Sequence, residues 1–147
     1  TIVGMDTTLA TSLSSSHGFF SEKLEDNLSS LLDEIPDDEK IILINHFPFF
    51  PSEKPRHSLV RGEALQKVIE SRSNIVFYLH GHTHRSSLAD LRGNGLPIIL
   101  DSGSVSHKRS SWNLLDFSSR GCEVSVYQIE KNSWKIVSNK EFLWNEK

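Results

Sequence analysis

The chain has 147 residues, of which 37% are hydrophobic and 24% are charged, and these proportions exclude a disordered protein. Its net charge of -3 at pH 7 offers no basic surface for DNA or RNA. No apolar run approaches the ~20 residues that cross a bilayer, so we expect no membrane span. Cys122 is the one cysteine, so an internal disulfide is excluded and a reducing compartment, the cytoplasm, is the expected location.

The first part of the chain alternates short apolar runs with helical patterns. The expected elements are a strand over 1–5, a loop over 7–16, a helix between Ser21 and Pro36, a strand over 41–45, a helix over 61–72 and a strand over 75–79. Because a helix connects the last two strands, these strands should run parallel and end at one edge of a sheet.

The second part shows the pattern of an antiparallel meander. Short strands are expected over 87–91, 97–100, 112–117, 123–129 and 134–142. Two Gly- or Asn-containing stretches, 92–95 and 131–132, are hairpin signals between these strands. We expect Trp112, Trp134 and Trp144 to pack on the faces of this meander.

Three histidines follow the two strands that the second helix connects. His82 and His84 come after the strand over 75–79, and on an extended backbone they would point the same way. His46 follows the strand over 41–45, which Pro48 should end. Open α/β sheets bind ligands at the carboxyl ends of their strands, and imidazole suits transition metals. The pattern therefore predicts a metal site, with a histidine-rich surface loop as the alternative.

The ordered motifs resemble those of the calcineurin-like metallophosphoesterases. His46 with Pro48, followed by Gly81-His82-Thr83-His84, is similar to the last two signature blocks of that family. Residues 2–6 resemble the preceding strand, and residues 101–104 resemble the following Gly-Ser turn. The resemblance implies an α/β fold (α+β by strict count) that forms half of a four-layer αββα sandwich. The segment near Asp6 is most similar to the cyclic-nucleotide phosphodiesterase branch.

The same resemblance implies a metal-dependent phosphoester hydrolase, either a phosphatase or a phosphodiesterase, with a two-metal centre. The expected cofactors are two divalent or trivalent transition-metal ions (Mn, Fe or Zn), and the expected partner is a small phosphoester substrate. His46 and His82 would bind one ion and His84 the other. The alternative is a metal-free scaffold of the same fold that binds a protein partner.

The family's earlier blocks, Asp-x-His, Gly-Asp-x-x-Asp and Gly-Asn-His, are not found in this chain. We therefore interpret residues 1–147 as the C-terminal portion of a single metallophosphoesterase domain. The N-terminal portion would be its partner, and it would carry the bridging carboxylate and the histidine that assists the leaving group.

Two further groups are candidates for substrate binding. Arg56 and His57 either contact a phosphate, since Arg can fork onto phosphate oxygens, or are solvated loop residues. Ser102, Gly103 and Ser104 either present donors to a bound phosphate or simply form a tight turn.

The remaining polar candidates lie close to the histidine motifs. Asp101 either accepts a hydrogen bond from a ligand histidine, fixing its tautomer, or helps to form the turn. His80 either supports a ligand histidine from behind or belongs to the edge of the core. Asn45 is interpreted as a cap at the end of its strand. His107 and Lys108 are candidates to line the pocket.

Overall fold

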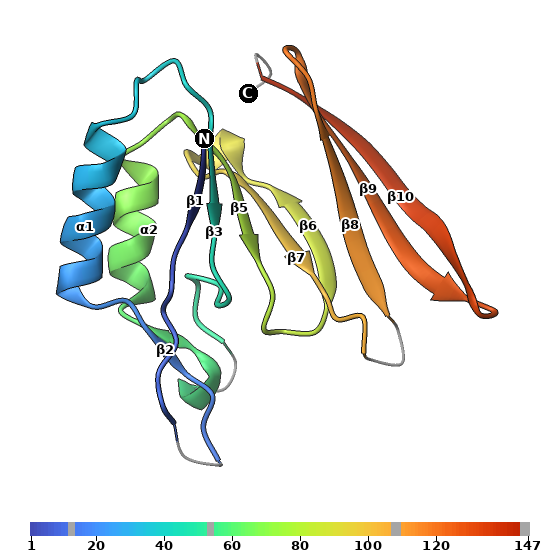
Figure 1. Ribbon diagram of the computed structural model, residues 1–147, viewed down its shortest axis with the longest axis horizontal. Helices are drawn as coiled ribbons and strands as arrows, with labels where there is room; N and C mark the ends of the chain where they lie inside the picture. The colour runs from blue at the N-terminus through green and yellow to red at the C-terminus, as the bar shows by residue number, and fades with distance from the viewer. Residues whose placement is uncertain (12–13, 53–54, 107–109, 145–147) are drawn as a thin grey trace. The chain divides into compact units, whose positions relative to one another are not determined.

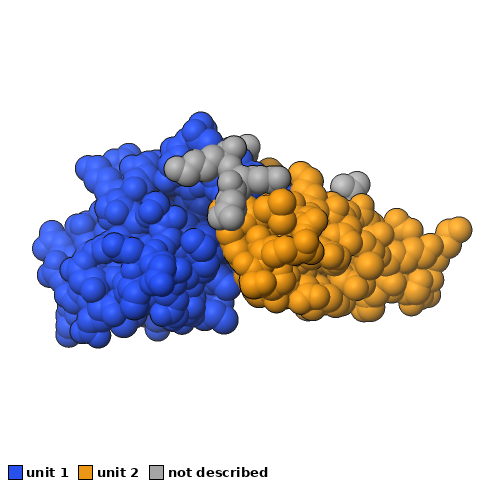
Figure 2. Space-filling model, turned by 90° about the horizontal axis from the view of Figure 1, so that it is seen from above, with its two compact units in different colours: residues 1–82, 88–100 blue, residues 83–87, 101–147 orange. Residues whose placement is uncertain are grey.

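The computed structural model describes residues 1–11, 14–52, 55–106 and 110–144. The chain divides into two compact units, which Figure 2 distinguishes by colour. Unit 1 comprises Thr1–His82 and Leu88–Leu100, and unit 2 comprises Thr83–Ser87 and Asp101–Lys147. Helices and sheets are both present, so the expected mixed α/β class is confirmed.

The largest sheet has five strands (Figure 1). Their order across the sheet is β1 (Ile2–Gly4), β3 (Ile41–Ile44), β5 (Ile75–His80), β7 (Ile98–Ser102) and β6 (Ser86–Asp90). Strand β3 pairs in parallel with both β1 and β5. The prediction that the two strands preceding the histidines run parallel is therefore confirmed, and they are also direct neighbours.

Two helices lie on the same side of this sheet (Figure 1), α1 (Glu22–Asp33) and α2 (Gly62–Glu70). Helix α1 begins where the sequence predicted, because the Ser21 side chain accepts a hydrogen bond from Leu24 N at 3.1 Å. Helix α2 begins at a glycine because a Cβ on Gly62 would lie 2.2 Å from the Phe49 carbonyl oxygen. Neither helix has the length and apolarity that a bilayer span requires.

The core of unit 1 forms between these helices and the sheet. Each helix contributes two buried side chains at helical spacing, and β3 and β5 contribute the opposing surface. These core residues include Leu28, Leu32, Leu65, Ile69, Ile41, Leu43 and Tyr78.

The expected meander is smaller in the structure than in the sequence pattern. Strands β6 and β7 join the five-stranded sheet, and only β8 (Ser111–Phe117), β9 (Gly121–Glu130) and β10 (Ser133–Leu143) form an antiparallel sheet. Both strands form and are neighbours, but the sequence pattern did not predict that they join the five-stranded sheet, because a turn signal shows where strands end and not which sheet they join. The β9–β10 turn is confirmed, since Lys131 and Asn132 both have positive φ angles, +48° and +64°.

Two local features differ from the sequence pattern. Residues 92–95 connect the neighbouring strands β6 and β7 through a short 3-10 helix, Arg92–Asn94, that ends at Gly95 with a φ of +76°, rather than through a two-residue turn. A pair of two-residue strands, β2 (Gly18–Phe19) and β4 (Leu59–Val60), pairs in parallel and was not predicted. Strands of this length carry no periodic signal.

Candidate functional site

Sheet register brings the ends of β3 and β5 to one place. Ile44 pairs with Leu79, so the residues that follow the two strands continue side by side. Gly81 N donates to the His46 carbonyl oxygen at 3.1 Å beyond the last pair of the ladder. His46 and His82 are therefore neighbours, although they are 36 positions apart in the chain.

The two imidazole rings face each other through nitrogen atoms. His46 Nε2 lies 3.2 Å from His82 Nδ1, and the ring planes cross at 80°. His82 Nε2 lies 2.8 Å from the carbonyl oxygen of His57. Because a carbonyl oxygen only accepts, this contact assigns the proton of His82 to Nε2 and turns the lone pair of Nδ1 toward His46.

This arrangement fits a shared transition-metal ion. Two nitrogens that each lie ~2.0–2.1 Å from a tetrahedral zinc ion are roughly 3.3 Å apart, close to the separation of His46 Nε2 and His82 Nδ1. A ligand histidine commonly donates its other N–H to a carbonyl group, as His82 does. Within the described part of the chain, no group of three His, Cys, Asp or Glu residues could hold a metal ion. A bound ion would therefore need ligands beyond this pair.

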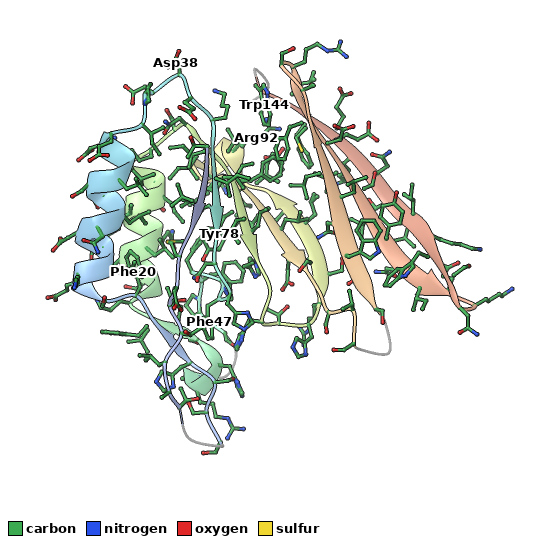
Figure 3. All side chains as sticks on the ribbon, viewed as in Figure 1. Phe20, Asp38, Phe47, Tyr78, Arg92 and Trp144 are labelled. Atoms are coloured by element: carbon green, nitrogen blue, oxygen red, sulfur yellow. The ribbon has the colours of Figure 1, made fainter. Side chains whose placement is uncertain are left out.

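Phe47 packs against both histidines. Its ring centroid lies 4.9 Å from that of His46 and 4.4 Å from that of His82. Gly18 makes room for it, since a Cβ there would lie 2.5 Å from Phe47 Cδ2. Figure 3 shows Phe47 near the end of the strands. Phe47 and Phe49 are both buried.

The turn that carries His82 and His84 does not continue the strand. His82 has a φ of +69° and His84 a φ of +57°, so both adopt the left-handed conformation. The prediction of an extended backbone is wrong here, because the strand ends at His80 and the chain turns at once. This conformation costs an L-residue roughly 1–2 kcal/mol, and such strain often occurs at functional sites. His84 is exposed and belongs to unit 2, so its ligand role stays a prediction.

Asp101 connects the histidine turn to the turn after β7. It is only 1% exposed, and it accepts hydrogen bonds from Thr83 Oγ1 and, at 2.9 Å, from Gly103 N. Thr83 Oγ1 also accepts from Arg85 N at 3.2 Å. The sequence left two roles open for Asp101, and these contacts are those of a residue that forms a turn.

The Ser102-Gly103-Ser104 segment forms a tight turn. Gly103 has a φ of +72°, and a Cβ there would lie 2.1 Å from Ser111 Oγ. Ser111 Oγ donates to the Ser102 carbonyl at 2.9 Å, and Ser111 N donates to the Ser104 carbonyl at 3.2 Å. Gly103 N already donates to Asp101. A donor role toward phosphate therefore stays a prediction, and the two serines are better candidates for it than the glycine.

Arg56 and His57 lie in a 3-10 helix, Pro55–His57. The His57 ring is half-buried, its Nδ1 is hydrogen-bonded to Ser16 Oγ, and its centroid lies 6.2 Å from that of His82. Arg56 is exposed, and its carbonyl oxygen accepts from Ser16 N at 3.1 Å. The structure thus brings His57 next to the histidine pair and leaves the Arg56 side chain at the surface.

His80 lies at the edge of the core. It is buried, its ring centroid lies 5.9 Å from that of Tyr78, and its Nδ1 lies 3.0 Å from the Gly81 carbonyl oxygen. These contacts favour the second of its two predicted roles. His107 and Lys108 lie outside the described residues.

Sequence reasoning missed a buried polar group behind the histidine pair. Thr7, Asn45 and Tyr78 are buried and hydrogen-bonded to one another through Asn45. Thr7 lies in a Ser/Thr-rich stretch that predicted a loop. A single polar residue in such a stretch gives no signal that it will be buried.

A scan against protein-family models finds no match, and a search of the curated proteins finds none either. Among solved structures, the chain is similar to a dimetal phosphatase from Danio rerio, with a TM-score of 0.67 and 16% sequence identity. The match covers 87% of this chain and 40% of the phosphatase chain. At this identity the likeness shows the fold alone: most of this chain shares the fold of part of that phosphatase, and the chain spans less than half the length of its neighbour.

Weaker similarity extends to two other structures. Vacuolar Protein Sorting 29 from Cryptosporidium parvum gives a TM-score of 0.46 at 17% identity, covering 63% of this chain and 46% of that one. Vps29 from Entamoeba histolytica gives 0.43 at 14% identity, covering 96% and 98%. These scores are too low to support a functional argument.

Proposed function

We propose that this chain supplies histidine ligands to a two-metal centre that hydrolyses phosphoesters. The observation that carries the proposal is the facing pair His46 Nε2 and His82 Nδ1, 3.2 Å apart, with His82 held by a backbone carbonyl. In this proposal His46 and His82 bind one ion and His84 binds the other. The similarity of the motifs and of the fold to dimetal enzymes supports this assignment.

The donor atoms limit the choice of metal. Neutral imidazole nitrogen suits Zn, Fe and Mn better than Ca or Mg, which prefer oxygen ligands. A bound pair of such ions would neutralise phosphoryl oxygens and lower the pKa of a water molecule. The chain's own contribution is orientation: the His57 carbonyl holds His82, and Phe47 packs against both rings.

The substrate would be a small phosphoester. In this proposal His57, whose ring centroid lies 6.2 Å from that of His82, contacts the phosphate, and Arg56, Ser102 and Ser104 are further candidates. Phosphomonoesters, cyclic nucleotides, nucleotide pyrophosphates and lipid-linked phosphates all fit this chemistry. The segment near Asp6 favours the cyclic-nucleotide phosphodiesterase branch among them.

The proposal also requires ligands from outside this chain. We interpret residues 1–147 as the C-terminal portion of one metallophosphoesterase domain, with the bridging carboxylate supplied by an N-terminal portion. Two histidines alone should bind a metal ion weakly, since a stable site usually has at least three protein ligands. The lone buried Cys122 supports a reducing location such as the cytoplasm.

Elemental analysis and activity assays on the full-length protein test this function. Aryl phosphate monoesters and diesters would be assayed with and without added Mn and after treatment with a chelator. An enzyme would retain about two transition-metal ions per chain, in line with a two-ion centre, and would lose turnover on chelation. A metal-free scaffold that binds a protein partner, the alternative interpretation, would show neither, and that result would overturn the proposal.

A further inference from the structure

Asn45 is buried directly behind the histidine pair and uses both ends of its amide. Its Oδ1 accepts from Thr7 Oγ1 at 2.7 Å and from the backbone N–H of His46 at 2.9 Å. Its Nδ2 donates to the Phe47 carbonyl oxygen and to the Tyr78 hydroxyl, both at 3.1 Å. These four contacts satisfy the two acceptor and two donor positions of a side-chain amide.

The contacts also fix which way the amide points. The His46 N–H can only donate and the Phe47 carbonyl can only accept, so the oxygen must face His46 and the nitrogen must face Phe47. Tyr78 donates to the same Phe47 carbonyl at 2.6 Å, and burial raises the pKa of this phenol, so it stays protonated. A residue without an amide cannot reproduce this set of contacts.

The two backbone groups that Asn45 holds belong to the residues that build the site. His46 carries one of the facing nitrogens, and Phe47 packs against both rings. A turn after a strand is free to rotate unless its backbone groups are held, and metal sites need their ligands placed to within about half an ångström. The Asn45 amide supplies this restraint in a fully satisfied buried network, which is rigid for that reason.

We propose that Asn45 is a positioning residue that fixes the orientation of His46 toward His82 and thereby sets the metal affinity of this half of the centre. The proposal deepens the hydrolase function proposed above and rests on it. It goes beyond a strand-end cap, because a cap would stabilise the fold without affecting the geometry of the imidazole pair.

Two substitutions within the same network separate positioning from stability. Asn45→Ser is neutral and removes all four bonds of the amide, including those to the His46 and Phe47 backbone. Thr7→Val removes only the bond from Thr7 to Asn45 Oδ1 and leaves the bonds to the His46 and Phe47 backbone in place. Asn45→Ala, which is also neutral and removes the same four bonds, replaces Asn45→Ser if that variant does not fold. Thermal unfolding of each variant would be recorded, so that binding is compared well below the unfolding transition.

The first readout is the affinity for Zn²⁺ in the full-length protein, measured by competition with a chromophoric chelator. We expect Asn45→Ser to weaken binding by ~10- to 100-fold, the range seen when groups that orient ligands are removed. The Zn²⁺ affinity of Thr7→Val should stay within about threefold of wild type. The lost bond does not contact the backbone of a ligand residue, so its loss should weaken binding by less than about 10-fold. Equal losses in both variants would show a general effect of stability and would overturn the proposal.

The second readout does not depend on metal or activity. Ring ¹⁵N NMR spectra of the metal-free protein report the tautomer and the conformational uniformity of His46 and His82. We expect one set of signals in wild type and in Thr7→Val, and shifted or multiple His46 signals in Asn45→Ser. If wild type binds no metal, the hydrolase function fails but this comparison still decides the role of Asn45. Unchanged His46 signals in Asn45→Ser would overturn that role.

Discussion

The ends of the parallel strands β3 and β5 and the antiparallel sheet of unit 2 organise their side chains in different ways. At the strand ends the contacts join distant segments: His46 meets His82 across 36 positions, and Thr7 meets Asn45 across 38. In the antiparallel sheet, Trp112 stacks on its cross-strand neighbour Tyr127 at 4.1 Å between centroids. Parallel crossovers concentrate distant functional groups at one edge, whereas hairpins pair residues that are close in sequence.

The two regions also differ in how they use polarity. The strand ends bury polar groups and satisfy them, as the four hydrogen bonds of Asn45 show. In the antiparallel sheet, Val124 is buried, whereas the cross-strand pair Ile129 and Trp134 is exposed. We expected Trp134 to pack on a face of the meander. In the structure its ring makes an edge contact with Trp112, but 43% of its surface stays exposed.

The largest expected effect tests the strand ends directly. His82→Ala in the full-length protein should lower hydrolysis of an aryl phosphate by at least ~100-fold, because a ligand should matter no less than the groups that orient it. His17→Ala is the matched control, since this half-buried histidine bonds to Ser15 rather than to the pair. Near-normal activity of His82→Ala, with the fold intact, would contradict the ligand assignment.

The packing of α1 in the core of unit 1 can be tested with two adjacent leucines of this helix. Leu32 is 1% exposed and Leu31 is 44% exposed. Leu32→Ala should therefore lower the free energy of unfolding by about 2–5 kcal/mol, and Leu31→Ala by no more than about 1 kcal/mol, as measured by urea denaturation. Similar losses for both variants would contradict the assignment of the buried face of α1.

Alkaline pH should destabilise the protein through one buried group in each region. Burial raises the pKa of the Cys122 thiol to about 11 and also raises the pKa of Tyr78. In the unfolded chain these groups ionise near their ordinary values of about 8.5 and 10. The folded state therefore binds more protons above pH ~8.5, and stability should fall as pH rises from there toward 11, by at most about 1.4 kcal/mol per pH unit for each group.

Urea denaturation at pH 7, 9 and 10 would measure this slope, and Cys122→Ala should make it shallower between pH 9 and 10. A slope that is identical in wild type and in the variant would show that the thiol does not contribute.

The smallest expected effect tests the hairpin that closes the antiparallel sheet. Asn132 has a φ of +64° in the β9–β10 turn, a conformation that glycine adopts without steric cost. Asn132→Gly should therefore raise the free energy of unfolding by up to about 1 kcal/mol. Asn132→Val is the matched control. It should lower the free energy of unfolding, because a β-branched residue is strained at this positive φ.

Local patterns were sufficient to predict several elements. The Ser21 cap and leucine spacing predicted α1, and the apolar runs predicted β3 and β5 to within a residue or two. The parallel crossover then predicted that His46 and His82 would meet, and in the structure they do. These features depend on backbone propensity and hydrophobic period, which neighbouring residues determine.

Other features depend on contacts that no local pattern records. The left-handed turn at His82 and His84 goes with the bond between Thr83 and Asp101, 18 positions away. The pairing of β7 with β5, rather than with the later strands, depends on which apolar surface buries it.

The sequence by itself determined the elements of this protein and the place where its histidines collect. Only the tertiary structure decided how those histidines are held: by the His57 carbonyl, by the Phe47 ring and by the Asn45 amide. The physical reason is that hydrophobic period acts over a few residues, whereas each of these restraints is a buried contact whose partners come together only when the sheet has formed.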